Sequence, residues 1–351
     1  MKSPTSSQAG HFANTLKLAM LVVAAFFTMP MAHAANTALG LDSSLNLLVF
    51  ENFLAPSSDV QGRVAVGGNA SFTSYSINTL AGAGALYSGT GLTVGGDLTF
   101  GSGSIYGNTL IGGNLSVGAG ASFLGNVQVG NNLNANNAWL NVNALTYGGT
   151  ASGVLASQNS LPVATASTTA LGIDFGAEKT RLSNLSLSFD GMANLGSLTA
   201  GAGGLILNAN GGNAAVFDLS AADVANNLLL SNLGPNATVL INVHGQNVNF
   251  GAHDYSNFAV GRVLFNLPEA TQITFASGVN ASFLAPLAQF SSSGGVINGQ
   301  VVVSSWTGST QVNDAPFSGS ISAVPEPSEY ALMLAGLATI GVFARRRGVT
   351  Q

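Results

Sequence analysis

The sequence predicts an all-β fold of the β-solenoid (β-helix) type, with one amphipathic α-helix along its flank and a single C-terminal transmembrane helix. Three observations lead to this prediction: a short phrase that recurs at near-constant intervals, a glycine-rich composition, and one segment with helical spacing. The chain has 351 residues and 45 glycines, and 46% of it is hydrophobic while only 7% is charged. Such a chain has too much apolar surface to stay disordered.

The recurring phrase is an aliphatic residue, two small residues, Asn or Asp, and an apolar residue. It begins at Val66, Val94, Ile111 and Val129, at intervals of 28, 17 and 18 residues. Repeats of this length are typical of solenoid coils, which stack their apolar positions on one another. The longer first interval requires an inserted loop at about residues 81–88.

Each phrase is expected to form a corner, at which glycine supplies a positive φ and Asn or Asp bonds its own backbone. The four polar residues would then form a stacked column. We expect this column to satisfy backbone groups, and a ligand-binding role is the less favoured alternative. The corner residues are Gly67, Gly68 and Asn69; Gly95, Gly96 and Asp97; Gly112, Gly113 and Asn114; and Gly130 and Asn132.

A helix is predicted at about residues 174–194, because apolar residues there fall on one helical face. These residues are Phe175, Leu182, Leu185 and Phe189. The helix is expected to pack along the flank of the solenoid, and the Ala-, Ser- and Thr-rich stretch 151–171 to lead into it. Further short strands should then complete the later coils. They are predicted at 205–208, 215–219, 238–243, 262–267, 272–275 and 300–303.

The N-terminus has the features of a secretory signal peptide. Lys2 and Lys17 precede an apolar stretch, and the small-x-small pattern of Ala32 and Ala34 marks a signal peptidase site. Cleavage is predicted after Ala34, with Ala35 as an alternative. The chain is therefore expected to be exported.

The C-terminus combines an acidic residue between two prolines, an apolar run and a basic stop. The apolar run is about 21 Å long as a helix, against a hydrocarbon core of about 30 Å, and is short for a permanent anchor. The order of these features resembles the PEP-CTERM sorting signal, which implies recognition and cleavage by an exosortase while the helix transiently holds the chain at the membrane. The residues concerned are Pro325, Glu326 and Pro327, followed by Arg345, Arg346 and Arg347.

The sequence thus divides into four parts. They are a signal peptide at 1–34, a β-solenoid domain at 35–308, a flexible spacer at 309–323, and a sorting signal at 324–347 with its transmembrane segment at about 330–344.

The exported part is acidic and contains no cysteine. Between residues 35 and 324, twelve acidic and four basic side chains give a net charge of 4 − 12 = −8. Nucleic acid is not expected as a partner, because phosphate binding requires clusters of Lys and Arg. Without cysteine there are no disulfides or thiolate metal sites, so core burial and backbone pairing must hold the fold.

A second resemblance covers about residues 39–308. The segment Ser57–Ala70 resembles the opening of the choice-of-anchor A domain, and later segments such as Val216–Ser220 and Ile297–Val302 are similar to the same family. The family is an adhesive module that microbes display through varied surface anchors. The resemblance implies class and location, and it transfers no binding-site residues.

The sequence does not predict an enzyme, and it predicts no cofactor or metal. Between residues 60 and 148 only Arg63 and Asp97 are charged, so the clustered carboxylates of solenoid lyases and glycosidases are missing. His253 and Asp254 are the nearest approach to a catalytic pair, with His244 close in sequence. Neighbouring strand residues point to opposite faces, which argues against a dyad.

Asp218 and Asp223 are a second pair of residues with a possible chemical role, because they could in principle share a Ca²⁺ ion. Their spacing lacks the dense oxygen ligands of known calcium loops. We therefore expect both carboxylates to serve turns.

Three functions stay open at this point. The favoured one is an adhesin that binds extracellular polysaccharide or other surface proteins at the cell surface or in the matrix of a Gram-negative-type bacterium. The second is ice binding, because bacterial ice-binding proteins resemble a β-solenoid with a flanking helix, although Thr93, Thr99 and Thr109 are irregular and Thr271 to Thr274 has the wrong spacing. A passive matrix component is the third.

Overall fold

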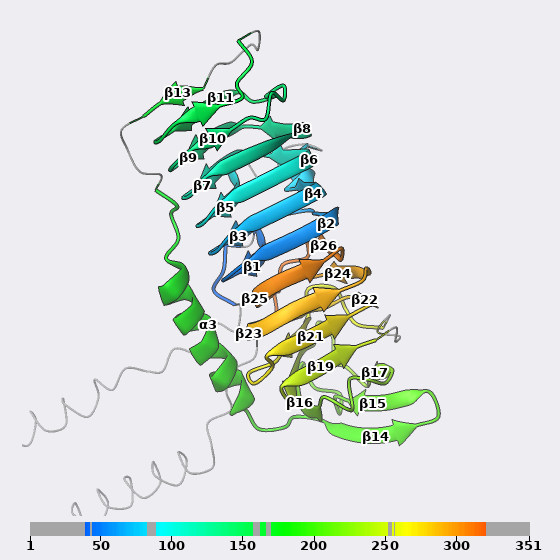
Figure 1. Cartoon of the computed structure of the whole chain (residues 1–351). Coiled ribbons are helices and arrows are strands. Elements are labelled where there is room, and N and C mark those ends of the chain that lie inside the picture. The colour runs from blue at the N-terminus through cyan, green and yellow to red at the C-terminus, as the bar shows by residue number, and fades with distance from the viewer. Residues whose placement is uncertain are drawn as a thin grey trace, which may run out of the picture. The chain divides into compact units, whose positions relative to one another are not determined.

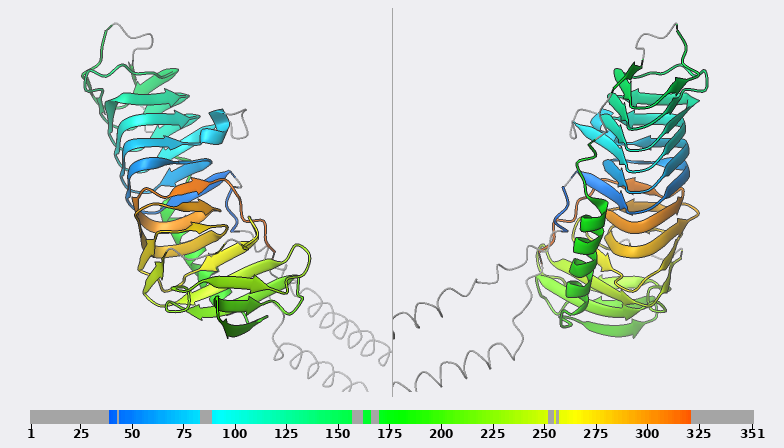
Figure 2. Two further views of the ribbon diagram at one scale, coloured as in Figure 1. Left: turned by 90° about the vertical axis from the view of Figure 1, so that its right-hand side faces the viewer. Right: turned by 60° about the vertical axis from the view of Figure 1, so that its left-hand side comes forward.

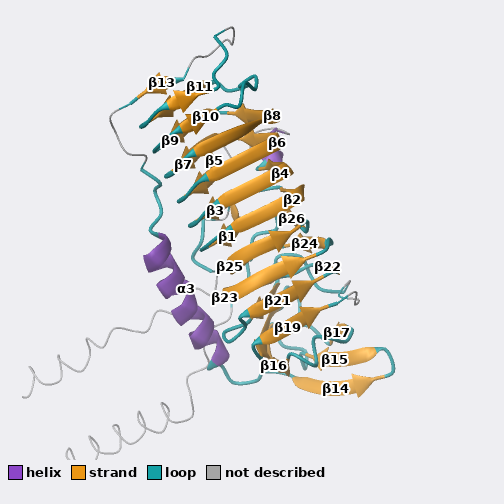
Figure 3. Cartoon of the chain, in the orientation of Figure 1, coloured by secondary structure: helices purple, strands orange, loops and turns teal. Residues whose placement is uncertain are grey.

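The computed structural model describes residues 39–42, 44–82, 89–156, 162–165, 170–251, 255 and 257–320. These residues belong to one compact unit, Thr37–Ile321. In it a long parallel sheet winds around a core, and helix α3 (Phe175–Asp190) lies along one side (Figures 1 and 2). Strands and short connections make up nearly all of the rest (Figure 3).

The first half of the chain contributes strands up to residue 164 and the short helix α2 (Thr79–Gly82), which occupies the start of the predicted insertion. The strands are β1 (Leu45–Val49), β2 (Phe53–Val60), β3 (Arg63–Val66), β4 (Ala70–Ile77), β5 (Thr90–Val94), β6 (Leu98–Tyr106), β7 (Asn108–Ile111), β8 (Leu115–Leu124), β9 (Asn126–Val129), β10 (Leu133–Asn134), β11 (Ala144–Tyr147), β12 (Ala151–Ser152) and β13 (Val163–Ala164). The last two lie in the stretch that was expected only to connect to the helix.

These strands pair in parallel with the strand two places along the chain, which stacks one coil on the next. One series runs from β1 through β3, β5, β7 and β9 to β11 and β13. The other runs from β2 through β4, β6 and β8 to β10 and β12. The register aligns the first residues of the four recurring phrases, as the repeat predicted: Val66, Val94, Ile111 and Val129. The long parallel sheet is consistent with a β-solenoid.

The second half of the chain builds a separate stack that starts at the opposite end. Its strands are β16 (Ala214–Ser220), β18 (Thr238–His244), β19 (Asn247–Phe250), β20 (Val263–Asn266), β21 (Gln272–Phe275), β22 (Gly278–Val279), β23 (Ser282–Ser292), β24 (Val296–Asn298), β25 (Val301–Gly308) and β26 (Gln311–Asn313). They stack back towards the beginning of the chain, where β25 pairs with β1 and β2, and β26 pairs with β2.

This connectivity differs from a continuous stack in chain order. The coil formed by β1 and β2 lies in the middle of the sheet, between the two halves (Figure 1). Helix α3 leads the chain from the β13 end to the β16 end. The later strands therefore complete the solenoid from the other side of its first coil.

A small second sheet lies at the β16 end and consists of β14 (Ser197–Gly201), β15 (Gly204–Asn208) and β17 (Leu228–Ser231). β14 and β15 form an antiparallel hairpin, and β17 is parallel to β15. The strand predicted at 205–208 is thus present, but it belongs to this sheet and not to a coil of the large one.

An aromatic column fills the core at the joint between the two halves. Trp306 of β25 stacks on Phe290 of β23, with ring centroids 4.2 Å apart, and its edge meets Phe53 of β2 at 5.8 Å. Phe53 in turn contacts Phe72 at 5.0 Å. All four rings are buried, so the same apolar column runs from the last coil into the first.

Helix α3 packs on a second apolar cluster, on the outside of the sheet. Asp174 caps its N-terminus by accepting from the backbone N–H of Ala177 at 3.0 Å. Leu182 and Phe189 are fully buried against strands of both halves, as the helical spacing predicted. The helix ends at Asp190, earlier than predicted, because Gly191 caps it.

Polar contacts fix the helix at its buried end. The hydroxyl of Ser186 donates to Asn266 Oδ1 at 2.5 Å, and Asn266 Nδ2 donates to the carbonyl oxygen of Ser186 at 2.9 Å and to Asn242 Oδ1 at 2.9 Å. Asn242 Nδ2 donates to the carbonyl oxygen of Phe189 at 3.0 Å. Asn242 and Asn266 are fully buried, so these bonds compensate for the loss of water.

The folded domain continues beyond residue 308, where the sequence placed the start of a flexible spacer. β26 pairs with β24, and Phe317 is buried in the cluster under α3, beside Leu39. Among the described residues, no helix is long and apolar enough to cross a membrane. The predicted transmembrane segment at 330–344 lies outside those residues.

The corner glycines have a different role from the one predicted. None of the described glycines at positions 67, 95, 112 and 130 has a positive φ. They are required because the coils approach closely: a Cβ at Gly112 would collide with the carbonyl oxygen of Gly95, and one at Gly130 would collide with that of Gly112.

Gly112→Ala is therefore expected to destabilise the fold by about 1–3 kcal/mol, because a backbone shift must make room for the methyl group. The measurement is the free energy of unfolding from a urea titration. Gly278→Ala is the matched control, since a Cβ there would meet nothing within 4 Å. An equal effect of both substitutions would contradict the steric explanation.

Candidate binding face

One side of the sheet presents two parallel rows of polar side chains, which we call the polar face. Each coil contributes one residue to each row, and these two residues lie on either side of a central strand residue. The central residue is buried in every coil except one, where it is Ala151. Row 1 contains Thr150, Asn132, Asn114, Asp97, Asn69, Asn52, Ser305, Gln289, Gln272 and Asn247. Row 2 contains Ser152, Asn134, Ser116, Thr99, Ser71, Leu54, Thr307, Ser291, Thr274 and Asn249.

Both rows cross the joint between the two halves without a break in register. The step occurs where Phe53 pairs with Trp306, so that Leu54 lies beside Thr307. Parallel strands are about 4.8 Å apart, and alternate residues of a strand about 6.7 Å, so these two spacings describe the array. Asp97 is its only charged member and Leu54, which is 48% exposed, its only apolar one.

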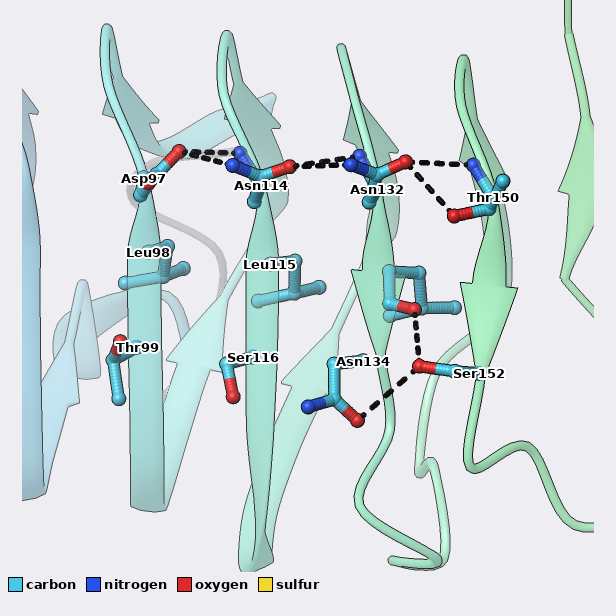
Figure 4. A pocket seen from close by; sticks show the side chains of 11 residues that line it. Asp97, Leu98, Thr99, Asn114, Leu115, Ser116, Asn132, Asn134, Thr150 and Ser152 are labelled. Atoms are coloured by element: carbon cyan, nitrogen blue, oxygen red, sulfur yellow. Dashed lines mark hydrogen bonds between the residues drawn. The ribbon is translucent and has the colours of Figure 1, made fainter.

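The predicted column of corner residues is present in row 1. Asp97 Oδ1 accepts from the backbone N–H and the Nδ2 of Asn114 at 2.7 and 2.9 Å (Figure 4). Asn114 Oδ1 accepts in the same way from Asn132, both at 3.1 Å, and Asn132 Oδ1 accepts from the backbone N–H and Oγ1 of Thr150 at 2.8 and 3.0 Å. At the other end, Asn69 Oδ1 bonds the N–H of Asp97.

From Asn52 to Asn132, row 1 therefore satisfies backbone groups at the corners, as expected, and these bonds fix its side chains in one orientation. Between rows 1 and 2 a shallow hollow of about 390 Å³ lies over the coils from Asp97 to Ser152, with the buried leucines as its floor (Figure 4). An ordered, polar and open surface of this kind suits contact with an extended ligand more than enclosure of a small one.

The structure separates the threonines considered for ice binding. Thr99 and Thr274 belong to row 2, whereas Thr93 and Thr109 are buried on other strands. The two-row array itself was not predicted. Its signal is the polar-apolar-polar triplet that follows each glycine corner, for example Asp97, Leu98 and Thr99.

Of the residues considered for catalysis, the structure describes His244, which lies among three carboxylates. His244 lies within 3.6–3.9 Å of Asp190, Asp218 and Glu269, and all four side chains are partly exposed. In the described part of the chain, no cluster of His, Cys, Asp or Glu is placed to hold a metal ion. His253 and Asp254 lie outside that part.

Asp218 and Asp223, considered as Ca²⁺ ligands, each have a protein partner. Asp218 Oδ1 accepts from Asn242 Nδ2 at 3.0 Å. Asp223 Oδ2 accepts from the backbone N–H and hydroxyl of Ser220 at 2.8 and 2.6 Å, which closes a turn.

Charged contacts tie α3 to the joint between the halves. Lys179 Nζ lies 3.1 Å from Glu51 Oε1, which also accepts from the hydroxyl of Ser304 at 2.8 Å. The hydrogen bond from Ser304, and after it the one from Lys179, lowers the pKa of Glu51. Asp42 accepts hydrogen bonds from Ser44 and forms an ion pair with Arg63 at 2.8 Å. These interactions, the bonds from Ser44 first among them, lower the pKa of Asp42. The α3 side is thus occupied, while the polar face is open among the residues that the structure describes.

Comparison with known families agrees with this architecture. A family described as a putative ice-binding-like adhesive domain matches residues 38–314. The chain belongs to this family. A PEP-CTERM protein-sorting motif matches residues 323–347. No curated protein and no solved structure matches the chain.

These matches confirm an adhesive domain followed by a PEP-CTERM sorting signal, and the more specific resemblance to the choice-of-anchor A domain stays a prediction. The ice-binding-like adhesive domain ends close to β26, and the sorting motif implies processing by an exosortase. The chain is accordingly an exported cell-surface protein. The sorting residues Pro325 to Pro327 and Arg345 to Arg347, and the signal peptidase site at Ala32 and Ala34, lie outside the described residues.

Proposed function

We propose that this protein is a surface or matrix adhesin that binds glycans or other matrix components through its polar face, and that it is not an enzyme. The observation that supports this proposal most directly is the continuity of the two polar rows across both halves of the solenoid. An adhesin must hold a long ligand by many weak contacts, and a repeated array offers the same contact in every coil.

The chemistry of the polar face favours neutral, hydroxyl-rich polymers. Its members are amides and hydroxyls, which both donate and accept hydrogen bonds. Sugar hydroxyls have the same dual character. A strongly charged polymer would find Asp97 as its only charged contact in the array. Proteins rich in polar side chains are the other matrix components that such a face can bind.

The test is a pair of substitutions that block row 2 in both halves. Thr99→Tyr with Thr274→Tyr is expected to weaken binding to the host's extracellular polysaccharide at least about tenfold, because bulky rings prevent close approach along the array. Gln128→Tyr is the control, since Gln128 is exposed on β9, outside the polar face. Binding by the double variant equal to that of wild type would refute the assignment of this face.

Ice binding is the second candidate, and the regular spacing of the two rows favours it. The predominance of Asn, Gln and Ser over Thr weakens it. Thermal hysteresis measured on the same sample distinguishes the two: hysteresis without polysaccharide binding would place ice recognition first. The absence of both polysaccharide binding and thermal hysteresis would favour a passive matrix role.

For the sorting signal we propose that the C-terminal helix holds the chain at the membrane until an exosortase cuts near Glu326. Glu326→Ala is expected to leave the protein in the membrane fraction, because the acidic residue between two prolines is the recognition element. Immunoblots of membrane and medium fractions measure this outcome. Release of the variant at the wild-type rate would remove the main support for the proposed sorting step.

A further inference from the structure

A single exposed indole stands at the β13 end of the solenoid. The chain has two tryptophans. Trp306 is buried, whereas Trp139 is 46% exposed, and among the described residues no other aromatic side chain is prominently exposed. Leaving a large ring in water forgoes roughly 1.5–3 kcal/mol of burial. Trp139 therefore contributes little to the fold for its size, and a role in binding explains its exposure better than packing does.

Trp139 is placed beside hydroxyl and amide groups. Ala138 and Leu140 are buried, whereas Trp139 and Asn141 are exposed, so the last two lie on the same, outer side of this segment. Asn141 is bridged in parallel to Ser122 on the neighbouring coil, and its Nδ2 donates to Ser122 Oγ at 3.0 Å. The exposed indole thus comes two residues before an amide that is hydrogen-bonded to a hydroxyl of the neighbouring coil.

The segment that holds Trp139 is well fixed. Asn136 and Asn137 have φ values of 51° and 56°, which turn the chain away from the polar face. Asn136 Nδ2 donates to the carbonyl oxygen of Val117 at 3.0 Å, and its backbone N–H donates to Asn134 Oδ1 at 3.1 Å. Asn134 is a member of row 2. The backbone turn that leads to Trp139 is therefore held in place, and it begins at Asn134, which lines the hollow of the polar face.

The surroundings of Trp139 contain no charge in the sequence. Residues 98–173 include no Asp, Glu, Lys or Arg. A ligand bound here is recognised by stacking and by neutral hydrogen bonds alone. Sites that combine one exposed aromatic face with a few polar groups fit ligands with an apolar surface and polar edges. A pyranose ring has this character, since its C–H face is apolar and its edge carries hydroxyls.

We propose that Trp139, Asn141 and Ser122 form a subsite for one neutral sugar unit of a polysaccharide. The indole stacks on the C–H face of the sugar, while the Asn141 amide and the Ser122 hydroxyl bond the hydroxyls at its edge. This inference rests on the proposed adhesin function and names the ligand class at one end of the domain. It adds a defined aromatic contact to the repeated weak contacts of the polar face.

The test uses the processed chain purified from the producing host, titrated by calorimetry with the host's extracellular polysaccharide and with neutral glucose hexasaccharides of β-1,4, β-1,3 and α-1,4 linkage. Trp139→Ala is expected to weaken binding at least about tenfold, and Trp139→Phe, which keeps an aromatic face, to weaken it less. Ligand should also change the tryptophan fluorescence of wild type but not of Trp139→Phe, because Trp306 is buried.

The outcomes separate this inference from the proposed function. If Trp139→Ala binds as tightly as wild type while the row 2 double variant loses binding, the subsite is overturned and the adhesin function stands. If wild type binds none of these glycans, the subsite is overturned and the glycan-binding form of the proposed function fails with it. An unchanged melting temperature for Trp139→Ala shows that any loss of affinity is not caused by unfolding.

Discussion

Trp306→Ala is expected to lower the free energy of unfolding by about 3–5 kcal/mol, the cost of truncating a large buried aromatic side chain. The ring is 1% exposed and lies between Phe290 and Phe53, so its loss opens a cavity where the last coil meets the first. The surrounding coils cannot collapse freely into this space, because their backbones are held in register on both sides.

The measurement is equilibrium denaturation in urea followed by far-ultraviolet circular dichroism. Trp139→Ala is the matched control: it removes the same side chain from an exposed position and should change stability by no more than about 0.5 kcal/mol. If the two substitutions had similar effects, the aromatic column would not be what joins the two halves.

Asn266→Ala is expected to destabilise the protein by about 3 kcal/mol, because it leaves buried polar groups without partners. The substitution removes the acceptor of the Ser186 hydroxyl and the donor to both the Ser186 carbonyl and Asn242 Oδ1. These groups lie between α3 and the sheet, where water cannot readily replace the lost bonds.

The effect should be visible as lower resistance of α3 to proteolysis as well as a lower unfolding free energy. Asn249→Ala serves as the control, since Asn249 is exposed in row 2 and its loss should be nearly neutral for stability. Equal stability of Asn266→Ala and wild type would mean that apolar packing alone holds the helix on the sheet.

The Trp306 prediction concerns the polar face as well as stability. Its upper coils come from residues before 153 and its lower coils from residues after 246, so the rows are continuous only because the joint aligns them. A variant with a loosened joint should therefore lose polysaccharide affinity in excess of its loss of folded fraction.

Much of the architecture could be predicted because it depends on local periodicity. The phrases at Val66, Val94, Ile111 and Val129 repeat at the length of one coil, and stacking identical coils buries the same positions each time. The helix at 175–190 was predicted for the same reason, since its apolar residues recur at helical spacing. The sorting signal also depends on short-range order along the chain.

The polar face was only half predicted. The column of Asn69, Asp97, Asn114 and Asn132 followed from the repeat, because identical corners must stack. Row 2 and the second half of the array were missed, since strands β19, β21, β23 and β25 share no phrase with the first half. The role of the corner glycines was also misjudged, because close approach between coils depends on how they stack and not on the φ of one residue.

The sequence by itself determined that this protein is exported, rich in parallel strands and provided with a C-terminal sorting address, because each of these properties is encoded in residues close together in the chain. Only the tertiary structure decided that the first coil lies in the middle of the sheet, with the last coil docked against it through Trp306 and Phe53. That contact joins residues some 250 positions apart, so no local sequence pattern specifies it. The docking is decided by the burial of the aromatic column, which is complete only when the last coil meets the first.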